Sequence, residues 1–575
     1  MRKVYVLALI ITSIALWLAS CQLSTRAQSS IVVDQMGYRP NDKKIAFLKE
    51  HHSGRFTVLG IGAKATALRG EVHPLGRTDQ NTGDLTFTID FSELKEPGMY
   101  RIYVGDSLGF SEEFGIGEDD YNPAVVSSLE SFSYQRCGTA VGDGTPWKHP
   151  ACHMKPAHFF DTPAMTMDVS GGWHDAGDYN KFVPTTAVSV AFLLYIYELR
   201  PDQFVDGQLR IPEARNCVPD ILDEARWGLT WLLKMQASDG GVYHKVSIRK
   251  WTGEHLPEKE TDTQFIFGVS STATGDFAAV TALGARLFGR WDKEFAQSLL
   301  RASVKAWEFL QHHPSIVPEG GFKNPDGVEG GEYGDESDSD ERLWASVELF
   351  KTTGNLDYHE YFLSHYRGLG GINYAVSWQH VQDFAYISYL SVPVNARNYQ
   401  ARSFVIATLT DYCDVLMKRI MNDGYRYALL PDQQYWGSNS VAMGNAFNLI
   451  NAYELTKFES YRDGALDQLH YMLGRNTFGM VFLTGLGADG VRHPYHQPSM
   501  LAGSGYPVPG LLVSGCNKFS RLKGREISGF AGLCYEDNEK NYFVNEPAIN
   551  YTASFVYVAA YCSSPLNTAI AKGKQ

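Results

Sequence analysis

Two aspartates three residues apart stand out in the stretch GGWHDAGDYNKFV, residues 171–183. Asp175 and Asp178 flank an Ala-Gly pair, and such small residues let a substrate approach the backbone closely. Two carboxylates on one turn can hold one water, with one taking its proton and the other orienting it. The flanking Trp173 and Tyr179 favour this interpretation, because a solvated Asp-rich turn, which is the alternative, has no need of bulky aromatics.

A general base needs a general acid, and the stretch YEDNEKNYFVNEPAINYTA, residues 535–553, supplies a candidate. Glu546 precedes Pro547 and an apolar run with helical spacing, so it lies at or just before the start of a helix. A carboxyl group among Tyr542 and Tyr551 would be partly desolvated, which raises its pKa and keeps a proton available near neutral pH. The alternative is a first-turn glutamate that complements the helix dipole.

The composition describes a globular chain with ample material for a core. Its 575 residues are 44% hydrophobic and 13% aromatic. Aromatic side chains in such numbers often line carbohydrate clefts, although they also fill cores. The formal net charge of −13 argues against a nucleic-acid partner and favours a neutral or cationic one.

Two kinds of periodicity divide the chain. Residues 29–116 hold short runs with a period of two, separated by Gly, Pro and Asn-Asp, which predicts an antiparallel, immunoglobulin-like β-sandwich over residues 30–117. From about residue 122 the apolar residues recur at helical spacing in roughly a dozen segments. Segments that are apolar on more than one face predict two concentric helical layers, an all-α (α/α)6 barrel over residues 118–567.

The N-terminus reads as a targeting segment. A basic start and an apolar run over residues 1–20 are followed by Leu-Ala-Ser and Cys21, a pattern that resembles the bacterial lipobox. We therefore expect lipidation of Cys21, a polar tether over residues 21–29, and an outer-membrane lipoprotein of the bacterial cell envelope that faces the periplasm or the cell surface. A plain signal peptide and an N-terminal membrane anchor are the alternatives.

The two acidic stretches together resemble the signatures of glycoside hydrolase family 9. Further stretches match in the order of the family, among them SFSYQRCG, CVPDILDEARWGLTWLLKMQ, WGSNSVAMGNAF and LGRNTFGMVFLTGLG. The resemblance implies an (α/α)6 barrel, often preceded by an immunoglobulin-like domain, that cleaves β-glucans with inversion at the anomeric carbon. It implies Asp178 as the general base, Asp175 as its water-holding partner and Glu546 as the general acid. Trp173, Tyr179, Trp436 and Tyr542 become candidates for stacking on sugars.

One further signature departs from the family, which usually has Arg-His-Pro-His-His-Arg-Pro-Ser. Here residues 492–499 read RHPYHQPS, so Tyr495 replaces a histidine and Gln497 an arginine that normally contact the sugar. Tyrosine still stacks and donates a hydrogen bond, but glutamine lacks the charge and planar fork of arginine. His493 and His496 remain as candidate substrate contacts or as structural histidines. The departure leaves the acid and base in place and makes the substrate less certain than for an ordinary endo-acting cellulase.

Two metal sites are also expected. Cys137, Cys152, His153 and His174 supply two thiolates and two imidazoles, which satisfy tetrahedral zinc without an open position. Free buried thiols or a disulfide between the two cysteines are the alternatives, and the resemblance implies a structural zinc. Asp340 and Glu341 match acidic calcium ligands of the family, but a further expected aspartate is missing after Trp378; acidic residues in the first turn of a helix are the alternative.

The main functional hypothesis is an inverting hydrolase of β-1,4-glucan-type polysaccharides or oligosaccharides, with no organic cofactor and a monomer by default. An exo-acting β-glucosidase or β-glucosaminidase differs in the bond that is cleaved. A catalytically inactive, glycan-binding surface lipoprotein and a lyase that uses Tyr495 and His496 are alternatives from other classes.

Overall fold

The computed structural model describes residues 29–49, 54–62, 65–522, 525–526 and 529–563. The predicted signal segment, Cys21 and most of the tether lie outside these residues. Across the described ranges, no helix combines the length and the apolar character needed to cross a membrane.

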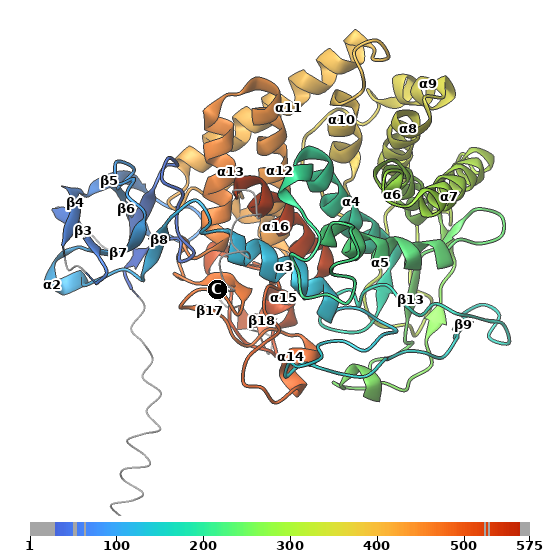
Figure 1. The fold of residues 1–575 in the computed structure, drawn as a ribbon, viewed down its shortest axis with the longest axis horizontal. Helices are drawn as coiled ribbons and strands as arrows, with labels where there is room; N and C mark the ends of the chain where they lie inside the picture. The colour runs from blue at the N-terminus through green and yellow to red at the C-terminus, as the bar shows by residue number, and fades with distance from the viewer. Residues whose placement is uncertain (1–28, 50–53, 63–64, 523–524, 527–528, 564–575) are drawn as a thin grey trace, which may run out of the picture.

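The N-terminal domain is a sandwich of two antiparallel sheets (Figure 1). Alternate residues of its strands point inward, as in β3, where Phe56 and Val58 are buried, and they pack around Tyr38 and Phe114. One sheet has the order β1 (Ile31–Val32), β2 (Ile45–Leu48), β6 (Leu85–Asp90), β5 (His73–Thr78), and the other has β4 (Thr66–Glu71), β3 (Arg55–Gly60), β7 (Gly98–Tyr103), β8 (Phe114–Ile116), with a short helix α2 (Gly105–Leu108) after β7.

The second domain consists of two layers of helices. Within the described residues, six helices form the inner layer: α4 (Val183–Leu199), α6 (Ser271–Phe288), α8 (Ser339–Thr353), α10 (Gln382–Leu390), α12 (Ser438–Thr456) and α16 (Ile549–Cys562). Six more lie outside them: α3 (Asn122–Tyr134), α5 (Asp220–Lys234), α7 (Lys293–His312), α9 (Leu356–His365), α11 (Tyr399–Asn422) and α13 (Glu459–Met472). This arrangement confirms the predicted fold.

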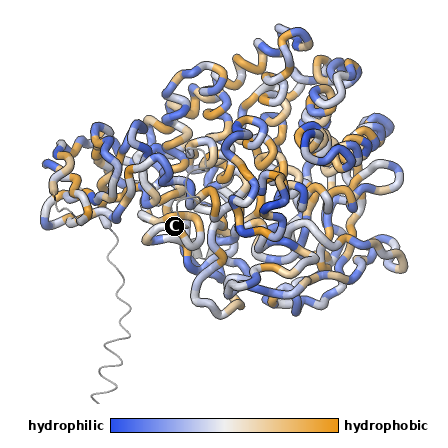
Figure 2. Tube along the Cα trace, in the orientation of Figure 1, coloured by the Kyte–Doolittle hydropathy of each residue, from blue (hydrophilic) through white to orange (hydrophobic). Residues whose placement is uncertain are grey.

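Burial follows from the layering. Residues 183–197 of α4 are all buried, because this helix packs against neighbours on every side, whereas α7 buries only the face that carries Leu299 and Ala306. Figure 2 accordingly shows hydrophobic stretches in the middle of the barrel and hydrophilic stretches along α7. Side chains cap several of the helices. For example, Ser270 accepts a hydrogen bond from Ala273 N at the start of α6, and Asp292 accepts one from Phe295 N at the start of α7.

Loops with short strands and helices gather at one end of the barrel, below the helices in Figure 1. They include a five-stranded sheet in the order β10 (Thr166–Met167), β9 (Ala157–Phe159), β14 (Phe265–Ile266), β13 (Lys245–Ser247), β11 (Lys181–Phe182). The other short elements are β12 (Val242–Tyr243), β15 (Val269–Ser270), β16 (Val481–Thr484), β17 (Gly490–Val491), β18 (Arg521–Leu522), β19 (Arg525–Glu526), α14 (Gln497–Leu501) and α15 (Tyr542–Asn545).

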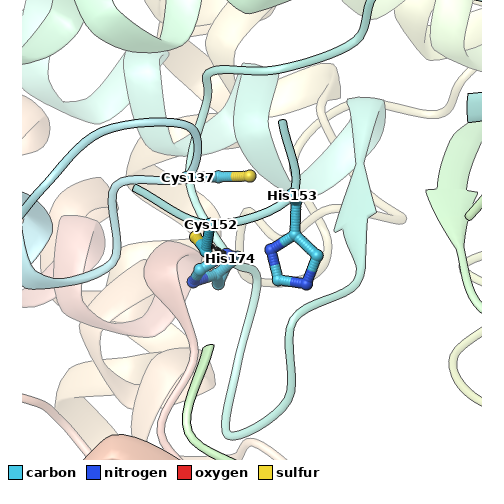
Figure 3. A group of neighbouring side chains, drawn as sticks. All are labelled: Cys137, Cys152, His153 and His174. Carbon is cyan, nitrogen blue, oxygen red and sulfur yellow. Dashed lines mark hydrogen bonds between the residues drawn. The ribbon is translucent and has the colours of Figure 1, made fainter. Parts of the chain in front are cut away.

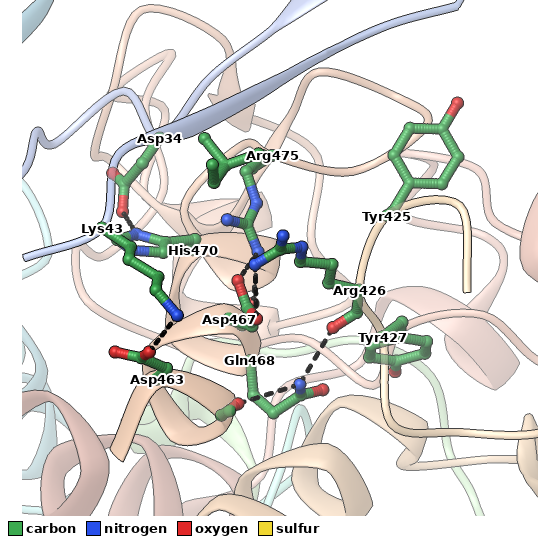
Figure 4. Close-up of polar contacts among 12 residues, drawn as sticks. Asp34, Lys43, Tyr425, Arg426, Tyr427, Asp463, Asp467, Gln468, His470 and Arg475 are labelled. Carbon is green, nitrogen blue, oxygen red and sulfur yellow. Dashed lines mark hydrogen bonds and ion pairs between the residues drawn. The ribbon is translucent and has the colours of Figure 1, made fainter. Parts of the chain in front are cut away.

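Polar contacts, some of them buried, join the two domains. Asp34, after β1, lies 2.7 Å from Nδ1 of His470 on α13, and Lys43 forms an ion pair with Asp463 of the same helix (Figure 4). Arg475 donates to Asp467 at 2.7 Å beside them. The sandwich therefore packs firmly against the outer layer of the barrel.

Candidate active site

The loop with the two aspartates runs directly into the inner helix α4. Residues Arg136 and Trp173 form an isolated bridge that ties the loop to the end of α3, and Asp175 N donates to Asn180 O at 2.9 Å to close the turn. Gly172 has a φ of +71° and lies against the ring of Trp231, so a side chain at this position would clash. The sequence Gly-Gly-Trp thus shapes the turn that presents Asp175 and Asp178.

Asp175 lies at the bottom of this turn and is only 1% exposed. One carboxylate oxygen accepts a hydrogen bond from the hydroxyl of Thr185 on α4, and the other accepts one from the hydroxyl of Tyr333 at 2.9 Å. Tyr333 lies seven residues before Asp340, one of the predicted calcium ligands. The carboxylate of Asp175 is therefore held in a fixed orientation.

Asp178 is partly exposed at the rim of the turn. Asn180 donates to it twice, from its side-chain amide at 2.6 Å and from its backbone N–H at 3.2 Å. Asn180 is itself held, because its Oδ1 accepts from Ile248 N at 3.3 Å. Donors aimed at a carboxylate favour its charged form, which is the form that a general base requires.

Glu546 comes to the same place from the other end of the chain. Its Oε1 accepts a hydrogen bond of 3.2 Å from Gly177 N, one residue before Asp178, and it is partly exposed. Ile549, the first residue of α16, donates its N–H to Asp175 O at 2.8 Å. The structure therefore brings Asp175, Asp178 and Glu546 into one site at the ends of α4 and α16.

Burial among like charges raises the pKa of all three carboxyl groups. Desolvation raises the pKa of Asp178 to about 6 and that of Asp175 to about 7. Desolvation and the charge of Asp178 hold the pKa of Glu546 well above its usual value. The site thus has carboxyl groups that can exchange protons near neutral pH.

Exposed aromatic side chains lie beside the carboxylates. Trp436 and Tyr542 are 41% and 40% exposed, and their rings are 5.6 Å apart. The ring of Tyr495 lies 5.7 Å from that of Tyr542, and the charges of Glu546 and Asp178 help burial to raise its pKa. Trp436, Tyr495 and Tyr542 are thus placed to stack on or hydrogen-bond to a sugar.

Four of the predicted sugar-contacting side chains are instead buried, and the structure corrects that prediction. Trp173 donates to Glu224 at 2.8 Å, and the hydroxyl of Tyr179 donates to His255 O at 2.5 Å. Their rings have no exposed face, because both are at most 2% exposed. The other two are His496 and Gln497, both 0% exposed.

His496 is a structural residue. Its ring nitrogens pair with Gln135 Oε1 and Ser499 Oγ, each at 2.8 Å, and burial lowers its pKa to about 3. Such a paired and buried imidazole is not placed to abstract a proton, which counts against the lyase alternative. His493, by contrast, is exposed, and its backbone N–H donates to Asp537 at 2.9 Å.

The predicted metal ligands form a compact group. Ligand atoms of Cys137, Cys152, His153 and His174 all lie within 4.8 Å of one another (Figure 3). The hydrogen bonds Cys137 N to Gly172 O, 2.9 Å, and His174 N to Gln135 O, 2.8 Å, pair the two segments that carry Cys137 and His174. The two cysteines are free, so the disulfide alternative is wrong.

The surroundings of this group fit a cation bound by thiolates. His153 Nε2 pairs with Glu260 at 3.0 Å, while its Nδ1 is buried without a partner. A ligand histidine typically uses one nitrogen for the metal and the other for such a carboxylate. Lys181 lies 3.5 Å from the sulfur of Cys137, and a hydrogen bond from Cys152 together with this charge keeps the pKa of Cys137 well below its usual value.

The predicted calcium ligands lie in a buried acidic patch. Asp340 and Glu341 occupy the first turn of α8, and Asp340 accepts a hydrogen bond from Val381 N at 2.9 Å. Asp276 of α6 is fully buried, and its oxygens have no partner. Among the described residues, however, only the cysteine–histidine group brings three or more metal-binding side chains together, so calcium at Asp340 and Glu341 stays a prediction.

Several residues of the site were not found from the sequence. Tyr333 and Thr185 orient Asp175, Asn180 orients Asp178, and Gln135 supports the turn by donating to Ala176 O at 2.9 Å. The position of Asn180 two residues after Asp178 is a local signal that could have been used. Tyr333 and Gln135 come from distant segments and give no such signal.

Comparison with known proteins decides the family. The sequence profile described as "Glycosyl hydrolase family 9" matches residues 121–559, and that of the "Cellulase N-terminal ig-like domain" matches residues 26–108. The chain belongs to glycosyl hydrolase family 9. It is therefore a glycoside hydrolase with an N-terminal immunoglobulin-like domain, as the two acidic stretches predicted.

Individual family 9 proteins match over nearly the whole chain. Endoglucanase D of Acetivibrio thermocellus is 31% identical over 541 residues, which cover 92% of this chain and 83% of the relative. The cellodextrinase of Butyrivibrio fibrisolvens is 30% identical and covers 92% of this chain and 98% of its own. A solved structure, the Zn-binding triple mutant of the family 9 endoglucanase J30, has a TM-score of 0.85 at 33% identity and covers 92% of this chain and all of its own.

Proposed function

We propose that this family 9 hydrolase cleaves β-1,4-linked glucans or cello-oligosaccharides with inversion at the anomeric carbon. The meeting of Glu546 with the 175–178 turn, through the 3.2 Å contact to Gly177 N, is the observation that carries the proposal. The endoglucanase and cellodextrinase relatives support the choice of substrate. Inverting enzymes use two carboxyl groups with room between them for the attacking water.

The proposed roles follow from the surroundings of each group. Asp178, hydrogen-bonded by Asn180, removes a proton from the water as it attacks the anomeric carbon. Asp175, which is held by hydrogen bonds from Thr185 and Tyr333, orients the same water. Glu546 keeps its proton because of burial and like charges, and donates it to the leaving glycosidic oxygen.

A time course on defined cello-oligosaccharides tests the proposed substrate. Chromatography should show release of glucose or cellobiose, and the order of products distinguishes internal from terminal cleavage. Formation of products with unsaturated ends would contradict hydrolysis, and inactivity on β-1,4-glucans with activity on another β-glycan would contradict the substrate.

We also propose that the cysteine–histidine group holds a structural zinc ion. Two thiolates and two imidazoles would complete a tetrahedral shell, so the ion would stabilise the turn before Asp175 and would not bind substrate. Because the four ligands form one site, metal analysis of the purified protein should give about one zinc per chain. Calcium near Asp340 and Glu341 is a separate expectation for the same analysis.

For the location of the enzyme, we propose a lipid anchor at Cys21 in the outer membrane. The proposal rests on the sequence pattern around Cys21, which lies outside the described residues. Fractionation of cells should place the wild type in the membrane fraction and Cys21→Ser in the soluble or secreted fraction. Equal distribution of the two proteins would contradict the anchor.

A further inference from the structure

One loop segment is held by two signature stretches of the chain, residues 171–183 and residues 492–499. Residues 251–256, here called the clamped segment, lie between β13 and β14. The peptide N–H of His255 donates to Gln497 Oε1 at 2.7 Å, and its C=O accepts from the hydroxyl of Tyr179 at 2.5 Å. Two buried side chains therefore bind the backbone of His255, one through its N–H and the other through its C=O.

Gln497 lies next to the active-site turn but is not exposed to solvent. It is 0% exposed, and its backbone N–H donates to Gly177 O at 3.0 Å, next to Asp178. The side-chain oxygen is the atom that holds His255. Arginine, which the related signature has at this position, offers only donors and could not accept this N–H. The glutamine thus gives this chain a contact that arginine cannot make.

The clamped segment carries an acidic side chain near Tyr495. Glu254 is exposed, and its charge acts on the hydroxyl of Tyr495 together with those of Glu546 and Asp178. The start of the segment is tied down as well, since Trp251 N donates to Glu329 at 2.9 Å. The clamped segment therefore places the charge of Glu254 near Tyr495 and the carboxyl groups of the site.

We propose that Gln497 and Tyr179 are positioning residues that hold the clamped segment beside the active site and thereby set the affinity for substrate. The inference rests on the proposed glucan hydrolase function. Gln497 acts through His255 and not by touching the sugar, which explains why a buried residue occurs within a substrate-binding signature.

Two conservative substitutions test the clamp. Gln497→Met keeps the length of the side chain but removes its strong acceptor, and Tyr179→Phe removes only the hydroxyl. Both should accelerate tryptic cleavage after Lys250 and Lys259, which are exposed in this loop, as measured by mass spectrometry of the fragments. Loss of one buried hydrogen bond should raise KM about 10-fold, with kcat changed less than about threefold.

Controls separate the clamp from folding and from function. Gln297→Met, on the exposed face of α7, should match the wild type in cleavage and KM. Gln497→Glu keeps an oxygen that can accept the hydrogen bond from His255 N, so it should protect the loop from cleavage better than Gln497→Met. Unchanged cleavage and unchanged KM in both test variants would overturn the inference. Faster cleavage in an enzyme whose wild type hydrolyses no glucan would support the clamp and contradict the proposed function.

Discussion

Asp178 and Glu546 have the same functional group but different hydrogen bonds. Asp178 accepts two from Asn180, one of them at 2.6 Å, whereas Glu546 accepts a longer one of 3.2 Å from Gly177. Hydrogen-bond donors stabilise the ionised form, and burial near other carboxylates stabilises the protonated form. This difference supports the proposed roles of Asp178 as the base and Glu546 as the acid.

Substitution of either residue should remove most of the activity. Asp178→Asn and Glu546→Gln keep the shape of the side chain but remove proton transfer, so kcat on cello-oligosaccharides should fall about 100- to 10,000-fold. Glu546→Gln should retain more activity on an aryl β-cellobioside with an acidic phenol, because that leaving group needs no proton. Equal losses of Glu546→Gln on both substrates, measured by initial rates, would contradict the acid role.

The pH profile follows from the same pKa shifts. Asp178 must be ionised to act, and its pKa is raised to about 6, so activity should fall as the pH drops below about 6. The raised pKa of Glu546 keeps it protonated at higher pH, so the alkaline loss of activity should come above the usual range of a glutamate. Profiles of kcat/KM against pH measure both limbs.

Asn180→Ala tests the origin of the acid limb. It removes the side-chain donor that favours the ionised form of Asp178, so the pKa of Asp178 should rise and the acid limb should move to higher pH. An acid limb that stays in place or moves to lower pH would show that another group controls it.

At the scale of elements, the metal group should stabilise the loop before α4. Cys137→Ser should abolish the proposed zinc binding and lower the melting temperature, because the two paired segments at residues 135–137 and 172–174 would lose their cross-link. Cys413→Ser, at a buried cysteine of α11, is the matched control and should keep the zinc. Retention of zinc by Cys137→Ser would contradict the proposed ligand set.

The sequence predicts these elements only in part. Local patterns indicate the Asp175–Asp178 turn and the helix start after Glu546, because each depends on residue types within a short stretch. The ligands of the metal group are spread over three segments, and their prediction rests on the resemblance to the family. The burial of Trp173, Tyr179 and His496 depends instead on partners such as Glu224, His255 and Gln135 in other segments. Aromatic content alone does not distinguish a core ring from a cleft ring.

At the scale of the molecule, the turn between β5 and β6 of the sandwich contacts the loop of the barrel that leads to Trp436. Asn81, between β5 and β6, donates to Asp423 Oδ2 and Leu429 O, each at 2.9 Å, and accepts from Gln434 at 2.7 Å. The backbone carbonyl of Asn81 accepts a hydrogen bond from Gly532 N at 2.7 Å. Gln434 lies two residues before Trp436, so this turn also supports an exposed aromatic ring of the site.

Removal of the Asn81 side chain should therefore destabilise the molecule. Asn81→Ala leaves buried groups of the barrel without partners, which should lower the free energy of unfolding by about 1–3 kcal/mol. Gln80→Ala, at the exposed neighbour in the same turn, should have little effect. Thermal or urea unfolding measures both, and equal stability of the two variants would contradict a role of this turn at the domain interface.

The whole-molecule arrangement was predictable in outline only. A change from period two to helical spacing near residue 122 predicts two domains and their classes. The contacts of Asn81 with Asp423 and of Asp34 with His470 join residues several hundred positions apart. Nothing in the sequence around any of these residues indicates its partner.

The stereochemistry of the first product tests the central claim most directly. Proton NMR of a cello-oligosaccharide, recorded during the first minutes of hydrolysis, distinguishes the anomers before mutarotation mixes them. Attack by a water held by Asp178, with Glu546 protonating the leaving oxygen, predicts the α-anomer as the initial product. Initial formation of the β-anomer would contradict the account.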